Sequence, residues 1–139
     1  MTDSLQRPAT IVGPVLRDVM TSRVATTSPE ESVAATAARM VHARVGSAVV
    51  MQGPFLVGIL TERDVLRAAA SGEDLSVAMV SDWMTPDPES AGPDCPAEEA
   101  AQIMLLHGFR HLPVVEKRVV CGVVSLRDLF AARIRRPVA

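Results

Sequence analysis

The feature that most constrains the fold is an internal repeat. When the sequence is shifted by 64 residues it matches itself without a gap, with ten identities over about 50 positions, where composition alone gives about three. A unit of about 60 residues is marginal alone, but two related units can share one core. Two copies with so long a period predict a pseudo-dimer with an approximate twofold axis, not a solenoid. The identical residues of the first copy are Asp18, Met20, Thr21, Pro29, Ala37, Met40, Val50, Gly58, Arg63 and Asp64.

Each copy begins with the same short elements. In the first copy an amphipathic segment ends at 20–21, and an extended piece follows around 24–27. Ser28, Pro29 and Glu31 then predict the start of a helix, because they suit the cap, the first helical position and the capping box.

Two strands and a second helix complete the copy. Strands are predicted at 48–51 and 55–60, around a hairpin signal, and a helix from Thr61. The second copy repeats the helix at 96–106, the strands at 112–115 and 119–124, and the last helix from Ser125. Each unit is therefore β-α-β-β-α, a mixed α/β fold. The expected organisation is a flexible N-terminus at 1–13, a first repeat at 14–70, a linker at 71–77, a second repeat at 78–135 and a tail at 136–139.

Charge and composition exclude several classes of protein. The net charge is −2 and aromatic residues make up 3%, which disfavours binding to nucleic acid. The sequence has no apolar run long enough for a transmembrane helix. Its first residues lack the basic and then apolar pattern of a secretory leader, so we expect none. Two cysteines are too few for a disulfide framework. We expect a cytoplasmic protein with neither a nucleic acid nor a membrane as partner.

Five segments carry a resemblance to a known family. They are Asp-Val-Met-Thr at 18–21, Gly-Ile-Leu-Thr-Glu-Arg-Asp at 58–64, Asp-Trp-Met-Thr at 82–85, His-Leu-Pro-Val-Val at 111–115 and Gly-Val-Val-Ser-Leu-Arg-Asp at 122–128. The sequence resembles the tandem cystathionine β-synthase (CBS) domain pair over roughly 14–135. The resemblance implies two repeats packed sheet to sheet, with clefts that bind AMP, ADP, ATP or S-adenosylmethionine. It also implies association into homodimers, and a regulatory ligand in place of a required cofactor.

Thr61 with Asp64, and Ser125 with Asp128, are candidate ligand residues at two strand-to-helix junctions. The simpler interpretation is a capping box, which needs no ligand. The functional one is that a helix N-terminus attracts phosphate while the carboxylate accepts from ribose hydroxyls. The resemblance implies that the aspartates hold ribose and that the hydroxyl residues lie near ribose or phosphate.

Other candidates surround these pairs. By the resemblance Arg110 and His111 face ligand phosphates, and we place them with the Asp128 site. The first copy has uncharged Gly46-Ser47 at the equivalent positions, which puts the site of the first repeat in doubt. Arg127 lies within reach of phosphate, although a solvated arginine is commoner. Four further candidates are Thr26 and Ser90, whose backbones would meet adenine, and Gly58 and Gly122, which would let a ligand approach the backbone.

The residues indicate no catalysis and no metal site. No Ser/His/Asp or Cys/His set can be assembled, and the histidines lack carboxylate partners at ligand spacing. We therefore expect a non-catalytic sensor of an adenosine-containing ligand, reporting to an effector protein whose identity the sequence leaves open. The alternative is a ligand-free pair that acts through protein–protein contacts.

Overall fold

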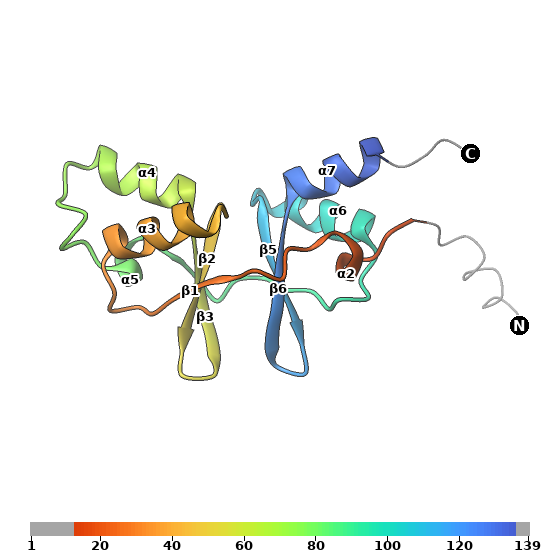
Figure 1. The fold of residues 1–139 in the computed structure, drawn as a ribbon, viewed down its shortest axis with the longest axis horizontal. Coiled ribbons are helices and arrows are strands. Elements are labelled where there is room, and N and C mark those ends of the chain that lie inside the picture. Colours follow the sequence, from red (N-terminus) through yellow and green to blue (C-terminus); the bar gives the residue numbers. More distant parts are fainter. Residues whose placement is uncertain (1–12, 136–139) are drawn as a thin grey trace, which may run out of the picture.

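The two repeats lie side by side, each with two helices beside a β-hairpin (Figure 1). The computed structural model describes residues 13–135. The expected tail at 136–139, and all but the last residue of the expected flexible N-terminus at 1–13, lie outside the described residues. The fold class is the mixed α/β class that the repeat predicts.

The first repeat contains β1 (Ala25–Thr27), α3 (Val33–Ala43), β2 (Ser47–Gln52), β3 (Phe55–Thr61) and α4 (Glu62–Ala70). Strand β2 pairs with β1 in parallel and with β3 in antiparallel orientation. The second repeat contains α6 (Ala97–His107), β5 (His111–Glu116), β6 (Val119–Ser125) and α7 (Leu126–Arg135). Its hairpin β5–β6 has the register of β2–β3 shifted by 64 residues, including the bulge.

Short segments cross between the repeats. Helix α2 (Leu16–Val19) begins the first repeat, yet Leu16 is fully buried in the core of the second repeat, with Met104 and Leu112. Helix α5 (Val80–Trp83) begins the second repeat and packs in the core of the first. Figure 1 shows the chain passing from α2 across to β1, and from α5 back again. Each repeat thus completes the hydrophobic core of the other.

The crossing segments also extend the sheets. Strand β4 (Thr85–Pro86) pairs with β3, and at the equivalent place Thr21 forms an antiparallel bridge with Val123 of β6. Gly58 and Gly122 lie under these crossings. A Cβ on Gly58 would come 2.5 Å from the sulfur of Met84, so the glycine admits the crossing chain.

The predicted start of the first helix is wrong. Helix α3 begins at Val33, and the Ser32 Oγ accepts a hydrogen bond from the Ala35 N–H. The carbonyls of Pro29 and Glu31 instead accept the N–H groups of Ser81 and Val80, at 3.0 and 2.9 Å. Pairing with α5 therefore holds this segment outside the helix.

Candidate ligand-binding clefts

Two clefts open between the repeats. Every residue that lines the first cleft has its 64-residue equivalent in the lining of the second cleft. The first cleft has a volume of about 330 Å³ and is lined by the segments 61–64, 85–89 and 108–111. The second cleft is larger, with a volume of about 1110 Å³. It is lined by the segments 21–25, 44–47 and 123–131, and also by Glu62, Arg110 and His111. Each cleft therefore combines one helix N-terminus with segments supplied by both repeats.

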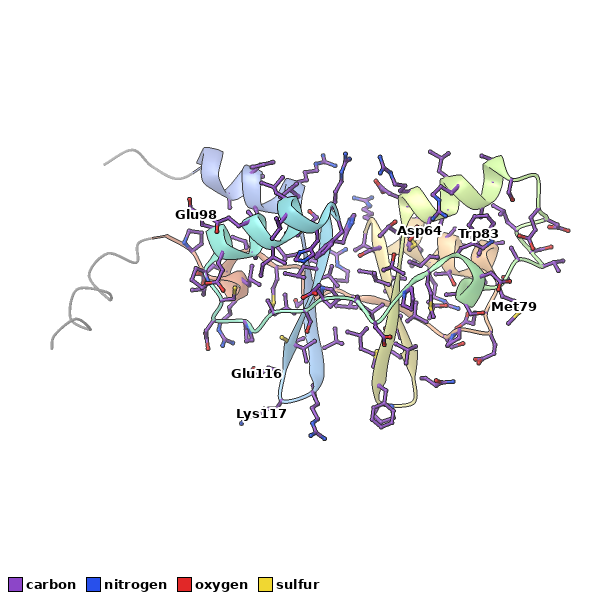
Figure 2. The ribbon with its side chains drawn as sticks, turned by 180° about the vertical axis from the view of Figure 1, so that it is seen from behind. Asp64, Met79, Trp83, Glu98, Glu116 and Lys117 are labelled. Atoms are coloured by element: carbon purple, nitrogen blue, oxygen red, sulfur yellow. The ribbon has the colours of Figure 1, made fainter. Side chains whose placement is uncertain are left out.

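Asp64 stands in the first cleft with both carboxylate oxygens engaged. Its Oδ2 accepts the Thr61 N–H and the Thr61 hydroxyl, each at 2.9 Å, and its Oδ1 accepts Arg67 Nη1 at 3.0 Å. Its side chain is buried at the end of α4 that points toward the second repeat, where Figure 2 labels it. This is the capping box that the sequence predicts, reinforced by an arginine one turn later.

Asp128 is held less completely in the second cleft. Its backbone N–H donates to the Ser125 Oγ at 3.0 Å, and its Oδ2 accepts the Ser125 N–H at 3.3 Å. Among the side chains of residues 13–132 none donates a hydrogen bond to its Oδ1. Position 67, whose arginine pairs with Asp64, corresponds to Ala131 here. The Asp128 carboxylate therefore keeps an acceptor oxygen for a ligand.

Arg110 and His111 lie between the clefts and line both. The predicted grouping of these residues with Ser125, Arg127 and Asp128 is thus present in the second cleft, but they also reach the first. Burial lowers the pKa of His111, and the nearby carboxylates of Glu62, Asp128 and Asp64 partly oppose that effect. The imidazole is therefore neutral at pH 7.

Gly46 leaves room where the repeats meet. A Cβ on Gly46 would come 3.0 Å from Glu62 Oε2 and 3.1 Å from His111 Nε2. Any side chain here would press on both groups, so the uncharged Gly46-Ser47 segment accommodates Glu62 and His111.

Four predicted residues line neither cleft. They are Thr26, Ser90, Gly58 and Gly122. The Thr26 carbonyl accepts Arg39 Nη1, and the two glycines lie under the crossing segments. The neighbours of Thr26 and Ser90, namely Ala25 and Glu89, are the residues that face the clefts.

Sequence reasoning missed the charged residues of the cleft walls. These are Arg23 and Arg44 in the second cleft, Asp87 and Glu89 in the first, and Glu62, which lines both. The 64-residue shift contains a signal for the walls, because it pairs segment 21–25 with 85–89 and 44–47 with 108–111. The sequence does not show which helix N-terminus each of these wall segments approaches, because that depends on how the chain crosses between the repeats.

Metal and membrane features were searched over the described part of the chain. Within residues 13–135 no group of three or more His, Cys, Asp or Glu side chains is placed to hold a metal ion. In the same range no helix has the length and apolar character needed to span a bilayer.

Comparison with known proteins places the chain in a family. The CBS domain family model matches residues 16–71 and 80–135. The chain is 37% identical over 115 residues to the CBS domain-containing protein YhcV of Bacillus subtilis, covering 82% of this chain and 81% of that protein. It is similar to the crystal structure of the CBS-domain protein ATU1752 of Agrobacterium tumefaciens, with a TM-score of 0.76, 28% identity, and coverage of 86% and 98%.

A further solved structure has the same fold with a ligand. It is the CBS domain pair of protein MJ0100 in complex with 5′-methylthioadenosine and S-adenosyl-L-methionine, with a TM-score of 0.78 and 22% identity, covering 86% of this chain and 95% of that one. The two matched segments coincide with the two repeats, and the relatives match across both. The chain therefore belongs to the CBS domain family and carries two CBS domains in tandem.

Proposed function

We propose that this CBS pair is a non-catalytic regulatory module that binds an adenosine-containing ligand between its repeats. The observation that carries the proposal is the second cleft, where Asp128 Oδ1 accepts no hydrogen bond from residues 13–132 and four arginines line the same cleft. The MJ0100 pair, bound to two adenosine derivatives, supports an adenosine-type ligand for this fold. AMP, ADP, ATP and S-adenosylmethionine are the candidates.

The chemistry of the second cleft suits each part of a nucleotide. A carboxylate at a helix N-terminus can accept both ribose hydroxyls, as Asp128 would. The first N–H groups of α7 and the guanidinium of Arg127 attract phosphate. Val24 and Val123 line the same cleft and offer an apolar wall to the adenine ring.

We further propose that the protein is a cytoplasmic homodimer that reports to an effector protein. Helices α3, α4, α6 and α7 lie along one side of the molecule, opposite the hairpin turns (Figure 1). Large apolar side chains are exposed on these helices, four of them at equivalent positions of the two repeats: Val41 with Leu105, and Leu66 with Phe130. Leu106 is a further exposed apolar residue of α6. A second copy would cover such a surface, and a ligand that shifts the two repeats would alter it.

One observation favours the alternative, a ligand-free pair that acts through protein–protein contacts. Both carboxylate oxygens of Asp64 accept hydrogen bonds from Thr61 and Arg67, so this carboxylate has protein partners without any ligand. If the second cleft behaves in the same way, the protein is an interaction module only.

The deciding experiment is a thermal-shift panel of AMP, ADP, ATP, GTP, NAD and S-adenosylmethionine. We expect an adenosine-containing ligand at 100 times its Kd to stabilise the fold by about 2.7 kcal/mol through mass action. Unchanged melting temperatures at millimolar concentrations of all six would replace the sensor with the interaction module.

A further inference from the structure

The two clefts are equivalent in backbone but opposite in charge. The second cleft is lined by four arginines and two carboxylates: Arg23, Arg44, Arg110 and Arg127 against Glu62 and Asp128. The first cleft is lined by four carboxylates and two arginines: Glu62, Asp64, Asp87 and Glu89 against Arg63 and Arg110. We propose that the two clefts bind different adenosine-containing ligands; this inference rests on the proposed function. The second takes a 5′-phosphorylated adenosine, and the first takes an adenosine whose 5′ substituent is uncharged or cationic.

The difference arises at the walls and not at the helix N-termini. Both helices keep an Arg-Asp pair in the first turn, at 63–64 and 127–128. The equivalent wall positions differ in charge: Arg23 corresponds to Asp87, Ala25 to Glu89, and Arg44 to Gly108. Three wall substitutions therefore account for the opposite net charges, because Glu62 and Arg110 line both clefts. The equivalent aspartates differ in that Arg67 also pairs with Asp64.

The charged residues of the cleft walls do not form ion pairs with neighbouring side chains of the described residues. Between the side chains of residues 13–132 no salt bridge within 4.0 Å involves Arg23, Arg44, Asp87 or Glu89. Arg23 Nη1 donates to the carbonyl oxygen of Ala43 at 3.3 Å, a neutral partner that leaves the guanidinium charge uncompensated.

Two neighbouring residues, Arg67 and His111, do not change the sign of the net charge of either cleft. Arg67 pairs with Asp64 beside the first cleft, and even when Arg67 is counted there, carboxylates outnumber arginines. His111 lines both clefts and is neutral at pH 7 because burial lowers its pKa.

These charges act on the part of the ligand that varies. A phosphate dianion forms strong charge-assisted hydrogen bonds with guanidinium groups and is repelled by carboxylates. A sulfonium or ammonium group has the reverse preference, and a thioether has little. Both clefts place an aspartate at a helix N-terminus, so the charge of the 5′ substituent is what distinguishes the ligands of the two clefts.

Calorimetric titration of the full chain with AMP and S-adenosylmethionine tests the division of ligands. We expect one AMP per chain, and we expect S-adenosylmethionine to bind the AMP-saturated protein with nearly the affinity that it has for the free protein. Two equivalent AMP sites per chain, or full competition between the ligands, would overturn the division while leaving the proposed function intact. If no adenosine-containing ligand binds, the proposed function fails, and this inference with it.

Cleft-specific variants supply the second test. Arg23→Asp and Arg127→Gln should each weaken AMP binding about tenfold or more, the scale of one ionic hydrogen bond. Arg118→Gln, an exposed charge at the hairpin turn outside both clefts, is the matched control and should change AMP affinity less than twofold. Asp87→Arg should raise the AMP stoichiometry from one to two. Circular dichroism checks folding, and unchanged AMP binding by a folded Arg23→Asp or Arg127→Gln protein contradicts the inference.

Discussion

Gly122 lies directly beneath Met20: a Cβ on this glycine would come 2.6 Å from the methionine sulfur and 2.9 Å from the carbonyl oxygen of Thr21. The sulfur is the far part of a flexible side chain and can move, but the carbonyl belongs to the segment paired with Val123. The glycine is therefore required by the crossing of the chain between repeats.

The first prediction concerns this contact. Gly122→Ala should lower the free energy of unfolding by about 1–3 kcal/mol, because overpacking displaces the crossing segment. Urea denaturation measures the change. Gly92→Ala is the matched control, since its nearest atom in that direction, the Val115 carbonyl oxygen, is 3.9 Å away. Equal midpoints for the two variants would show that the crossing tolerates a methyl group.

The second prediction separates the two aspartates. Asp64→Ala should destabilise the ligand-free protein by about 2–3 kcal/mol, because it leaves a cap, a hydroxyl and an arginine without their acceptor. Asp128→Ala should lower the free energy of unfolding of the ligand-free protein by only about 1 kcal/mol, because the Asp128 carboxylate accepts a single backbone N–H at 3.3 Å.

Ligand response should follow the opposite order. Asp128→Ala should remove most of the thermal stabilisation by AMP, and Asp64→Ala should retain it. Differential scanning fluorimetry with and without AMP gives both quantities in one experiment. If both variants keep the full AMP shift, Asp128 is a helix cap and not a ribose ligand.

The sequence predicts the repeat unit well because its signals are local. The turn signal at 52–54 between two apolar runs predicts the hairpin β2–β3, which the structure confirms. The predicted strands at 48–51 and 55–60 are Ser47–Gln52 and Phe55–Thr61 in the structure. The Thr61 capping box sets the start of α4 in the same way. Each of these elements is decided by residues within a few positions of one another.

The crossing and the cleft walls could not be predicted from local pattern. Ser28, Pro29 and Glu31 carry a good helix-start signal, but two backbone hydrogen bonds to α5, some 50 residues away, hold that segment outside the helix. The opposite charges of Arg23 and Asp87 look like solvated side chains until the fold brings each to a helix N-terminus of the other repeat. Tertiary contacts override the local preference in both places.

The third prediction is a loss of stability between neutral and mildly acid pH. Burial holds the pKa of His111 below its usual value near 6.5, so the unfolded chain binds this proton more readily than the folded one. The free energy of unfolding should therefore fall as pH decreases from about 7 through 6.5 toward the lower folded-state pKa. His111→Gln should reduce that slope, measured by urea denaturation at pH 7.5 and 5.5. If His111→Gln has the same dependence of unfolding free energy on pH as the wild type, groups other than His111 cause the loss of stability.

The last prediction concerns assembly. Leu106 is 81% exposed on α6, and with Val41 and Leu105 it forms part of the apolar surface on the helical side of the molecule. If a second copy covers this surface, light scattering at micromolar concentration should give twice the 14.8 kDa chain mass. Leu106→Glu should then yield the monomer, because pairing would bury an uncompensated charge. Val119→Glu, at a similarly exposed residue of the hairpin, should leave the dimer intact. A wild-type mass of 14.8 kDa, or dissociation by both variants alike, would rule out a dimer formed through the helices.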